Sequence, residues 1–211
     1  MKAPILIPAK KFSLRCPGKN LKLLRWTIDW LGSEKDRAIL LTDSEELIKQ
    51  GSDIKSYFTL NTDGELIVFQ EWLKQNPGIT EYIYLPLTQP LRELDLLSRL
   101  DNMVMGDDID FITSYTITQD RTIFEITEEG KFKYPSPAGR KGSLCSEKKV
   151  LDGAIYYIKS DFTLSLSTND INRAFWNGRI GLIENNMPLL DIDTPQDLSC
   201  FNNLKALYNV E

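Results

Sequence analysis

The first 118 residues alternate short apolar segments with amphipathic ones, and this alternation constrains the fold more than any other feature of the sequence. Strands of this kind joined by helices imply a mostly parallel sheet with right-handed crossovers. We predict strands at 3–7, 37–42, 56–60, 81–87 and 111–118, with Pro8 ending the first, and helices at 21–31, 45–50, 65–75 and 92–105. The sequence therefore predicts an α/β protein built on one mostly parallel sheet.

The pattern changes after Gln119. Residues 123–126 and 131–134 can pair as a hairpin, and the polar segment 136–149 interrupts the core, so we place an excursion at about 120–150. Further strands are expected at 153–159, 179–184 and, briefly, 190–193, with a helix or loop at 161–169 and a last helix from Thr194-Pro195 to about 208. No linker is long enough to separate two domains, so residues 1–211 are expected to form one domain.

Composition narrows the possible chemistry. The chain has no histidine, which excludes a Ser-His-Asp triad and any histidine-ligated metal. A metal must then bind carboxylates, which favours a hard cation such as Mg²⁺. A net charge of −5 argues against general nucleic-acid binding.

The cellular compartment is predicted from features that the sequence lacks. Its three cysteines are far apart and are expected to be reduced thiols. No apolar run approaches the ~20 residues that cross a membrane, and the start is too short for a signal peptide. We therefore expect a cytoplasmic protein with no membrane partner.

A cationic loop follows the first predicted strand. Its cations are accompanied by a hydroxyl and an amide. The carboxyl end of a strand in an open α/β sheet is a common anion site, and a nucleotide triphosphate is the best anion to propose there. The residues concerned are Lys10, Lys11, Ser13, Arg15, Lys19 and Asn20.

Two carboxylates near the end of the chain are spaced for one metal ion. Asp191 and Asp193 stand at i and i+2, and on an extended segment they point to the same side. They can share one Mg²⁺, or the segment can be a strand end followed by the helix cap at Thr194. Both interpretations stay open from the residues alone. Asp197 is expected to complement the helix N-terminus.

Five segments, in order along the chain, resemble one family. They are residues 7–20 (IPAKKFSLRCPGKN), 42–46 (TDSEE), 85–92 (LPLTQPLR), 152–156 (DGAIY) and 191–198 (DIDTPQDL). This order is similar to that of the acylneuraminate cytidylyltransferases, the CMP-sialic acid synthetases, and the chain resembles a divergent member. The resemblance implies a Rossmann-like nucleotidyltransferase fold with a small dimerisation excursion, and a homodimer. It also implies Mg²⁺-dependent transfer of CMP from CTP to a 2-keto sugar acid, releasing pyrophosphate, for surface polysaccharide or glycan synthesis.

The resemblance also implies roles for particular residues. Arg92 and Asp152 are expected at the sugar, with a surface arginine in a first helical turn as the alternative for Arg92. Asp63 is expected at the nucleotide, with a turn and helix cap as its alternative. The metal ligands are expected to be Asp191 and Asp193. The remaining nucleotide contacts are Ala9, Lys10, Ser13, Arg15, Lys19 and Asn20, with Lys10, Lys19 and Asp193 as catalytic residues.

The chain departs from the family pattern around these sites. Lys10 stands at the family's arginine, Phe12 at a small residue, Leu14 at a lysine and Pro86 at a glutamine. Lysine neutralises a phosphate but lacks the bidentate fork of arginine. Two alternatives stay open: a catalytically weakened or inactive homologue that binds nucleotide or a partner, and a nucleotidyltransferase that uses another nucleotide or acceptor.

Overall fold

An inner strand of the sheet is formed by the apolar start of the chain. In the computed structural model, which describes residues 2–60, 64–119, 125–126, 132–133, 147–167 and 177–205, this strand is β1 (Ile5–Ala9). Ile5, Leu6 and Ile7 are fully buried. Ile5 and Ile7 pack into one hydrophobic cluster and Leu6 into a second. Alternation in a strand therefore gives the sheet a core on both of its faces.

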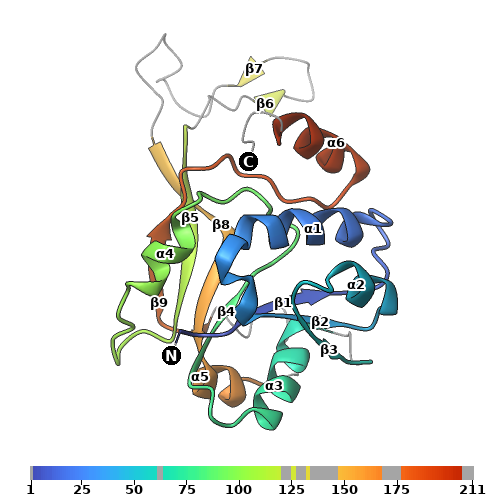
Figure 1. The fold of residues 1–211 in the computed structure, drawn as a ribbon. Coiled ribbons are helices and arrows are strands. Elements are labelled where there is room, and N and C mark those ends of the chain that lie inside the picture. Colours follow the sequence, from blue (N-terminus) through green and yellow to red (C-terminus); the bar gives the residue numbers. More distant parts are fainter. Residues whose placement is uncertain are drawn as a thin grey trace.

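A seven-stranded sheet runs through the described part of the chain (Figure 1). Only β8 runs antiparallel to its neighbours, so the prediction of a mostly parallel sheet is confirmed. The strands, in spatial order, are β3 (Lys55–Phe58), β2 (Ala38–Thr42), β1, β4 (Glu81–Tyr84), β8 (Glu147–Lys159), β5 (Phe111–Gln119) and β9 (Ile180–Glu184).

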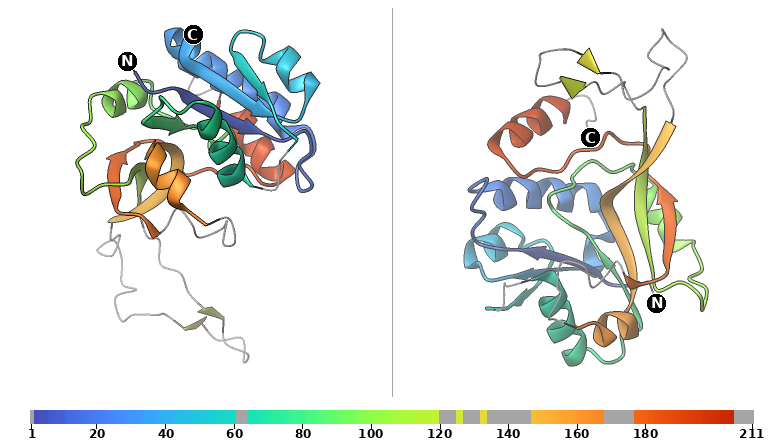
Figure 2. Two further views of the ribbon diagram at one scale, coloured as in Figure 1. Left: turned by 90° about the horizontal axis from the view of Figure 1, so that it is seen from below. Right: turned by 180° about the vertical axis from the view of Figure 1, so that it is seen from behind.

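Helices cover both faces of this sheet, as the two views in Figure 2 show. One cluster joins the sheet to α1 (Lys19–Leu31), α2 (Glu45–Gln50), α4 (Leu96–Asp101) and α6 (Pro195–Leu204). The other joins it to α3 (Glu65–Gln75) and α5 (Ser160–Ser165). A short 3₁₀ helix, η1 (Gly32–Arg37), connects α1 to β2.

The direction of winding reverses at β1. The chain passes from β1 to β2 and β3 on one side, and then through α3 to β4 on the other side of β1. The carboxyl ends of β1 and β4 therefore border a topological switch point. Ligands of open α/β sheets bind at such points.

Pro8 does not end the first strand, contrary to the prediction. β1 continues to Ala9, and Pro8 stands in register with Leu41 of β2. On the β4 side of β1, the Leu6 carbonyl accepts a hydrogen bond from Leu85 N. Backbone groups two residues apart in a strand point to the same side, so the nitrogen of Pro8 also faces β4. The registered pairing with β4 has ended by then, so the missing N–H of proline costs no ladder bond.

Several element boundaries also differ from those predicted. The helix expected at 92–105 is reduced to α4, and β8 begins at Glu147 instead of residue 153. Residues 190–193 form no strand. Ser44 caps α2 by accepting from Leu47 N.

The excursion is described only in part. β6 (Glu125–Ile126) and β7 (Phe132–Lys133) pair as the predicted antiparallel hairpin. The rest of the expected excursion up to residue 146 lies outside the described residues, as do Asp63 and Cys145. Cys16 and Cys200 are free thiols. Among the described helices, none combines the length and the apolar character needed to span a bilayer.

Candidate functional site

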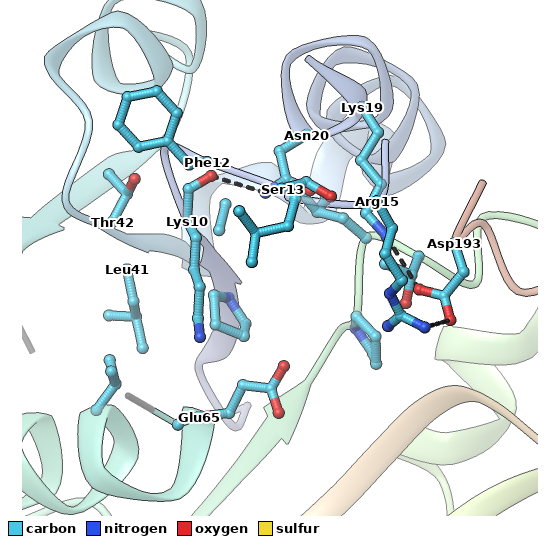
Figure 3. Close-up of a pocket in the computed structure, with 18 of the residues that line it drawn as sticks. Lys10, Phe12, Ser13, Arg15, Lys19, Asn20, Leu41, Thr42, Glu65 and Asp193 are labelled. Carbon is cyan, nitrogen blue, oxygen red and sulfur yellow. Dashed lines mark hydrogen bonds and ion pairs between the residues drawn. The ribbon is translucent and has the colours of Figure 1, made fainter. Parts of the chain in front are cut away.

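A cavity of about 670 Å³ opens at the switch point. It is bounded by the ends of β1, β2 and β4, the start of α3 and the segment before α6 (Figure 3). The structure brings together there eight of the residues that the sequence singles out. They are Ala9, Lys10, Ser13, Arg15, Lys19, Asn20, Asp191 and Asp193.

Hydrogen bonds fix the loop between β1 and α1. Asn20 Nδ2 donates to the Lys10 carbonyl at 2.7 Å, which closes the loop across its base. Ser13 Oγ accepts from Cys16 N at 3.3 Å, and Asp43 Oδ1 accepts from Lys11 N at 2.6 Å. The loop is therefore held to its own helix and to the end of β2, with the Lys10 side chain exposed at the cavity.

Lys19 joins the two ends of the chain. It is the first residue of α1, after Gly18 at φ 75°, a conformation that favours glycine. Its side chain is buried, and its ammonium group donates to the Ile192 carbonyl and to Asp193 Oδ1. Lys19 therefore holds the segment that carries both expected metal ligands against the start of α1.

Asp191 and Asp193 face the cavity together, as their spacing predicts. Ile192, between them, is fully buried, and its N–H donates to the Thr88 carbonyl at 2.8 Å. Arg15 Nη1 lies 2.8 Å from Asp193 Oδ2. Burial, and then the neighbouring charge of Asp193, raise the pKa of Asp191.

The helix cap does not use these two carboxylates. Thr194 accepts from Asp197 N, and Asp197 accepts from Thr194 N, so that the pair forms a capping box at the start of α6. The role predicted for Asp197 is confirmed. The helix cap predicted at Thr194 is therefore present, and the Asp191 and Asp193 side chains take no part in it, so a Mg²⁺ shared by this pair stays a prediction.

The donor set fits one Mg²⁺ completed by phosphate oxygens. Among the described residues, no three acidic or cysteine side chains gather into a metal cage. Mg²⁺ usually takes only one or two carboxylates, with waters and substrate phosphates as its other ligands. Asp191 and Asp193 would supply such a pair, and a bound cation would oppose both the burial and the neighbouring charge of Asp193 that raise the pKa of Asp191.

Sequence reasoning missed two residues of the cavity, Glu65 and Tyr84. Glu65 begins α3 and Tyr84 ends β4, and their side chains are hydrogen-bonded. Glu65 is exposed at the cavity; desolvation of its carboxyl raises its pKa, which Tyr84 and then Lys10 partly lower. The sequence could have indicated these residues only by their position: Glu65 begins a helix and Tyr84 ends a strand, both at the edge of the sheet where the carboxyl ends of the parallel strands lie.

Arg92 and Asp152, the expected sugar ligands, do not line the cavity. The Arg92 guanidinium is buried over the Trp30 ring and donates to the carbonyls of Pro86 and Ala154; burial lowers its pKa to about 9. Asp152 accepts from Asn185 Nδ2 at 2.6 Å and from Ser114 Oγ. Arg92 holds the backbone of Pro86, which lines the cavity, and the charge of Asp152 interacts with Arg92. Arg92 is therefore not the surface arginine of the alternative.

Comparison with known proteins rests on structure. No protein-family model matches the sequence, and no curated protein matches it. A solved structure of CMP:2-keto-3-deoxy-manno-octonic acid synthetase complexed with CTP is 17% identical, with a TM-score of 0.64 over 99% of this chain and 100% of that one. A cytidylyltransferase from Leptospira borgpetersenii is 15% identical, with a TM-score of 0.66 over 100% and 89%.

A third solved structure carries another nucleotide. HddC from Yersinia pseudotuberculosis, complexed with GMP-PN, is 13% identical, with a TM-score of 0.64 over 99% of this chain and 100% of that one. These likenesses cover nearly the whole chain. They show that the protein has the Rossmann-like nucleotidyltransferase fold that its sequence predicts.

Proposed function

We propose that the protein transfers CMP from CTP to a 2-keto sugar acid and releases pyrophosphate. The observation that carries this proposal is the meeting of a cationic loop and a carboxylate pair at one switch-point cavity. The loop contributes Lys10, Arg15 and Lys19, and the segment before α6 contributes Asp191 and Asp193.

The proposed reaction needs positioning and charge neutralisation more than covalent catalysis. Lys10 and Arg15 are exposed at the cavity and neutralise triphosphate oxygens, while Lys19 keeps Asp193 in place. A Mg²⁺ on Asp191 and Asp193 would neutralise further phosphate charge. The acceptor hydroxyl forms the new bond to the α-phosphorus, the bond to the bridging oxygen breaks, and the hydroxyl proton passes to solvent.

The choice of CTP and a sugar acid rests on two supports. The sequence resembles the acylneuraminate cytidylyltransferases in five segments, and a structural neighbour is a CMP:2-keto-3-deoxy-manno-octonic acid synthetase complexed with CTP. The same resemblance leads us to propose a homodimer, which sedimentation analysis at several protein concentrations tests.

A second nucleotide is worth testing because the HddC structure holds a guanine nucleotide analogue. A site that binds GTP would make the same contacts to the phosphates and the metal, and would differ from a CTP site in its contacts to the nucleotide base. The nucleotide panel therefore includes CTP, UTP, GTP and ATP.

Pyrophosphate release with each nucleotide, Mg²⁺ and a panel of 2-keto sugar acids tests the proposal. We expect turnover with CTP, and a loss of at least about 100-fold in Asp193→Asn and Asp191→Asn, because each would weaken the binding of the Mg²⁺ that neutralises phosphate charge. Asp107→Asn, at an exposed aspartate that does not line the cavity, is the matched control. Equal rates in wild type and Asp193→Asn contradict the proposal, and CTP binding without turnover indicates a nucleotide-binding homologue.

A further inference from the structure

The cavity has two chemically different sides. Figure 3 shows Arg15, Lys19 and Asp193 on one side, and Lys10 and Glu65 on the other. The first side carries the ion pairs of Asp193 and the proposed metal ligands. The second side carries the carboxyl of Glu65 and the hydroxyl of Tyr84, which no step of the proposed phosphate chemistry uses.

The position of the Glu65 carboxyl is fixed by Tyr84. The Tyr84 ring stacks on Tyr156 at 5.1 Å between ring centroids and meets the edge of Phe69 at 4.9 Å. Burial, followed by the Glu65 charge, raises the pKa of Tyr84 well above its ordinary value, so its hydroxyl stays protonated and donates to Glu65. Two aromatic contacts therefore orient the phenol, and the phenol orients the carboxylate.

The chemistry of this side selects its ligand group. A carboxylate accepts hydrogen bonds at about four lone-pair positions, and Tyr84 takes only one of them. Phosphates and a sugar carboxylate are repelled by Glu65 and attracted by Lys10. The group that fits Glu65 is therefore a neutral hydrogen-bond donor, and a sugar presents such donors as neighbouring hydroxyls.

We propose that Glu65, oriented by Tyr84, binds a vicinal diol of the substrate and is the residue that selects for it. This inference rests on the proposed nucleotidyltransferase function. A diol is present both in the ribose of the nucleotide and in the acceptor sugar. The two sources share one chemistry, and the experiment separates them.

Isothermal titration with Mg²⁺ compares CTP and 2′,3′-dideoxy-CTP on wild type, Glu65→Gln and the control Glu46→Gln, an exposed glutamate of α2. If the ribose is the source, wild type prefers CTP by about tenfold, as expected for a hydrogen bond to a charged group, and Glu65→Gln reduces that preference to below threefold. If the acceptor is the source, Glu65→Gln leaves CTP affinity unchanged and raises the acceptor KM about tenfold. Thermal unfolding of each variant checks that it is folded.

Two further readouts sharpen the test. Tyr84→Phe removes the orienting hydroxyl and is expected to weaken the same selection about threefold. The selection is also expected to fall on acidification, because only the ionised carboxylate accepts from both hydroxyls, and Glu65→Gln removes that dependence. The groups that face Glu65 are Lys10, Tyr84 and Tyr156.

The outcomes separate this inference from the proposed function. Failure of wild type to bind any nucleotide with Mg²⁺ overturns both. The inference alone is overturned if wild type binds CTP and 2′,3′-dideoxy-CTP with equal affinity and Glu65→Gln leaves the acceptor KM within twofold. It is also overturned if the two affinities are equal and the wild type uses no acceptor in the panel.

Discussion

Lys19 Nζ lies 3.4 Å from Asp193 Oδ1, although the two residues are 174 positions apart in the sequence. Lys19 is 6% exposed, and the same ammonium group donates to the Ile192 carbonyl. One buried cation therefore joins the start of α1 to the segment that carries Asp191 and Asp193. The geometry of the proposed metal site depends on this contact.

Replacing Lys19 should affect stability and metal-dependent binding together. Lys19→Met leaves the Ile192 carbonyl without its donor, and we expect a loss of about 2 kcal/mol in the free energy of unfolding. Asp193 also loses a cationic partner, so the Mg²⁺ dependence of CTP binding should change. Urea unfolding and titration calorimetry measure the two effects. Lys22→Met, at an exposed lysine of the same helix, should change neither, and an unaltered stability of Lys19→Met would show that the contact contributes nothing.

Replacing Lys10 should affect binding alone. Its side chain is exposed at the cavity, so Lys10→Met is expected to change the free energy of unfolding by less than about 0.5 kcal/mol. The variant loses a phosphate-neutralising charge, and we expect CTP affinity to fall about tenfold at low salt and less at high salt. The neighbouring Lys11 does not line the cavity, so Lys11→Met is the matched control. Equal affinity of the two variants would remove Lys10 from the nucleotide site.

The ion pair of Asp110 and Arg179 should make stability depend on acid pH. Arg179 donates from its guanidinium and backbone N–H to Asp110, and these contacts lower the pKa of Asp110 to about 2. Because the pKa of this carboxyl is depressed on folding, its contribution is complete above its ordinary pKa of 3.8 and is lost as pH falls towards about 2.

Urea unfolding at pH 5, 3 and 2 measures this contribution. Arg179 is largely exposed, so the pair is expected to be worth less than about 1 kcal/mol. Wild type should lose stability more steeply than Asp110→Asn across this range. Parallel curves for the two proteins would show that the carboxylate does not contribute.

Local patterns were sufficient to predict the sheet and the loop after its first strand. Ile5 to Ile7 is an apolar run that could be buried on both faces, and Asp191 and Asp193 share a side because extended chain alternates. Pro8 was misjudged because its tolerance depends on where a neighbouring strand stops pairing, which local sequence does not encode.

Residues whose role depends on distant partners could not be predicted in the same way. Glu65 and Tyr84 meet because α3 and β4 begin and end at the same edge of the sheet, and the two residues share no motif. Arg92 occupies a motif position, yet its guanidinium is buried against carbonyls from β8 and from the segment after β4. Motif position therefore located Arg92 near the site without giving the direction of its side chain.

Asp152 gives the sharpest test between a structural role and the expected sugar contact. It is 7% exposed and accepts hydrogen bonds from Asn185 and Ser114. Burial lowers the pKa of Arg92, and the charge of Asp152 opposes this by raising it. Asp152→Ala leaves those donors and that charge uncompensated, and we expect a loss of about 3 kcal/mol in the free energy of unfolding. The acceptor KM, measured below the unfolding transition, should stay within twofold of wild type, as should that of the exposed control Asp107→Ala. A tenfold rise in acceptor KM with wild-type stability would instead assign Asp152 to the sugar.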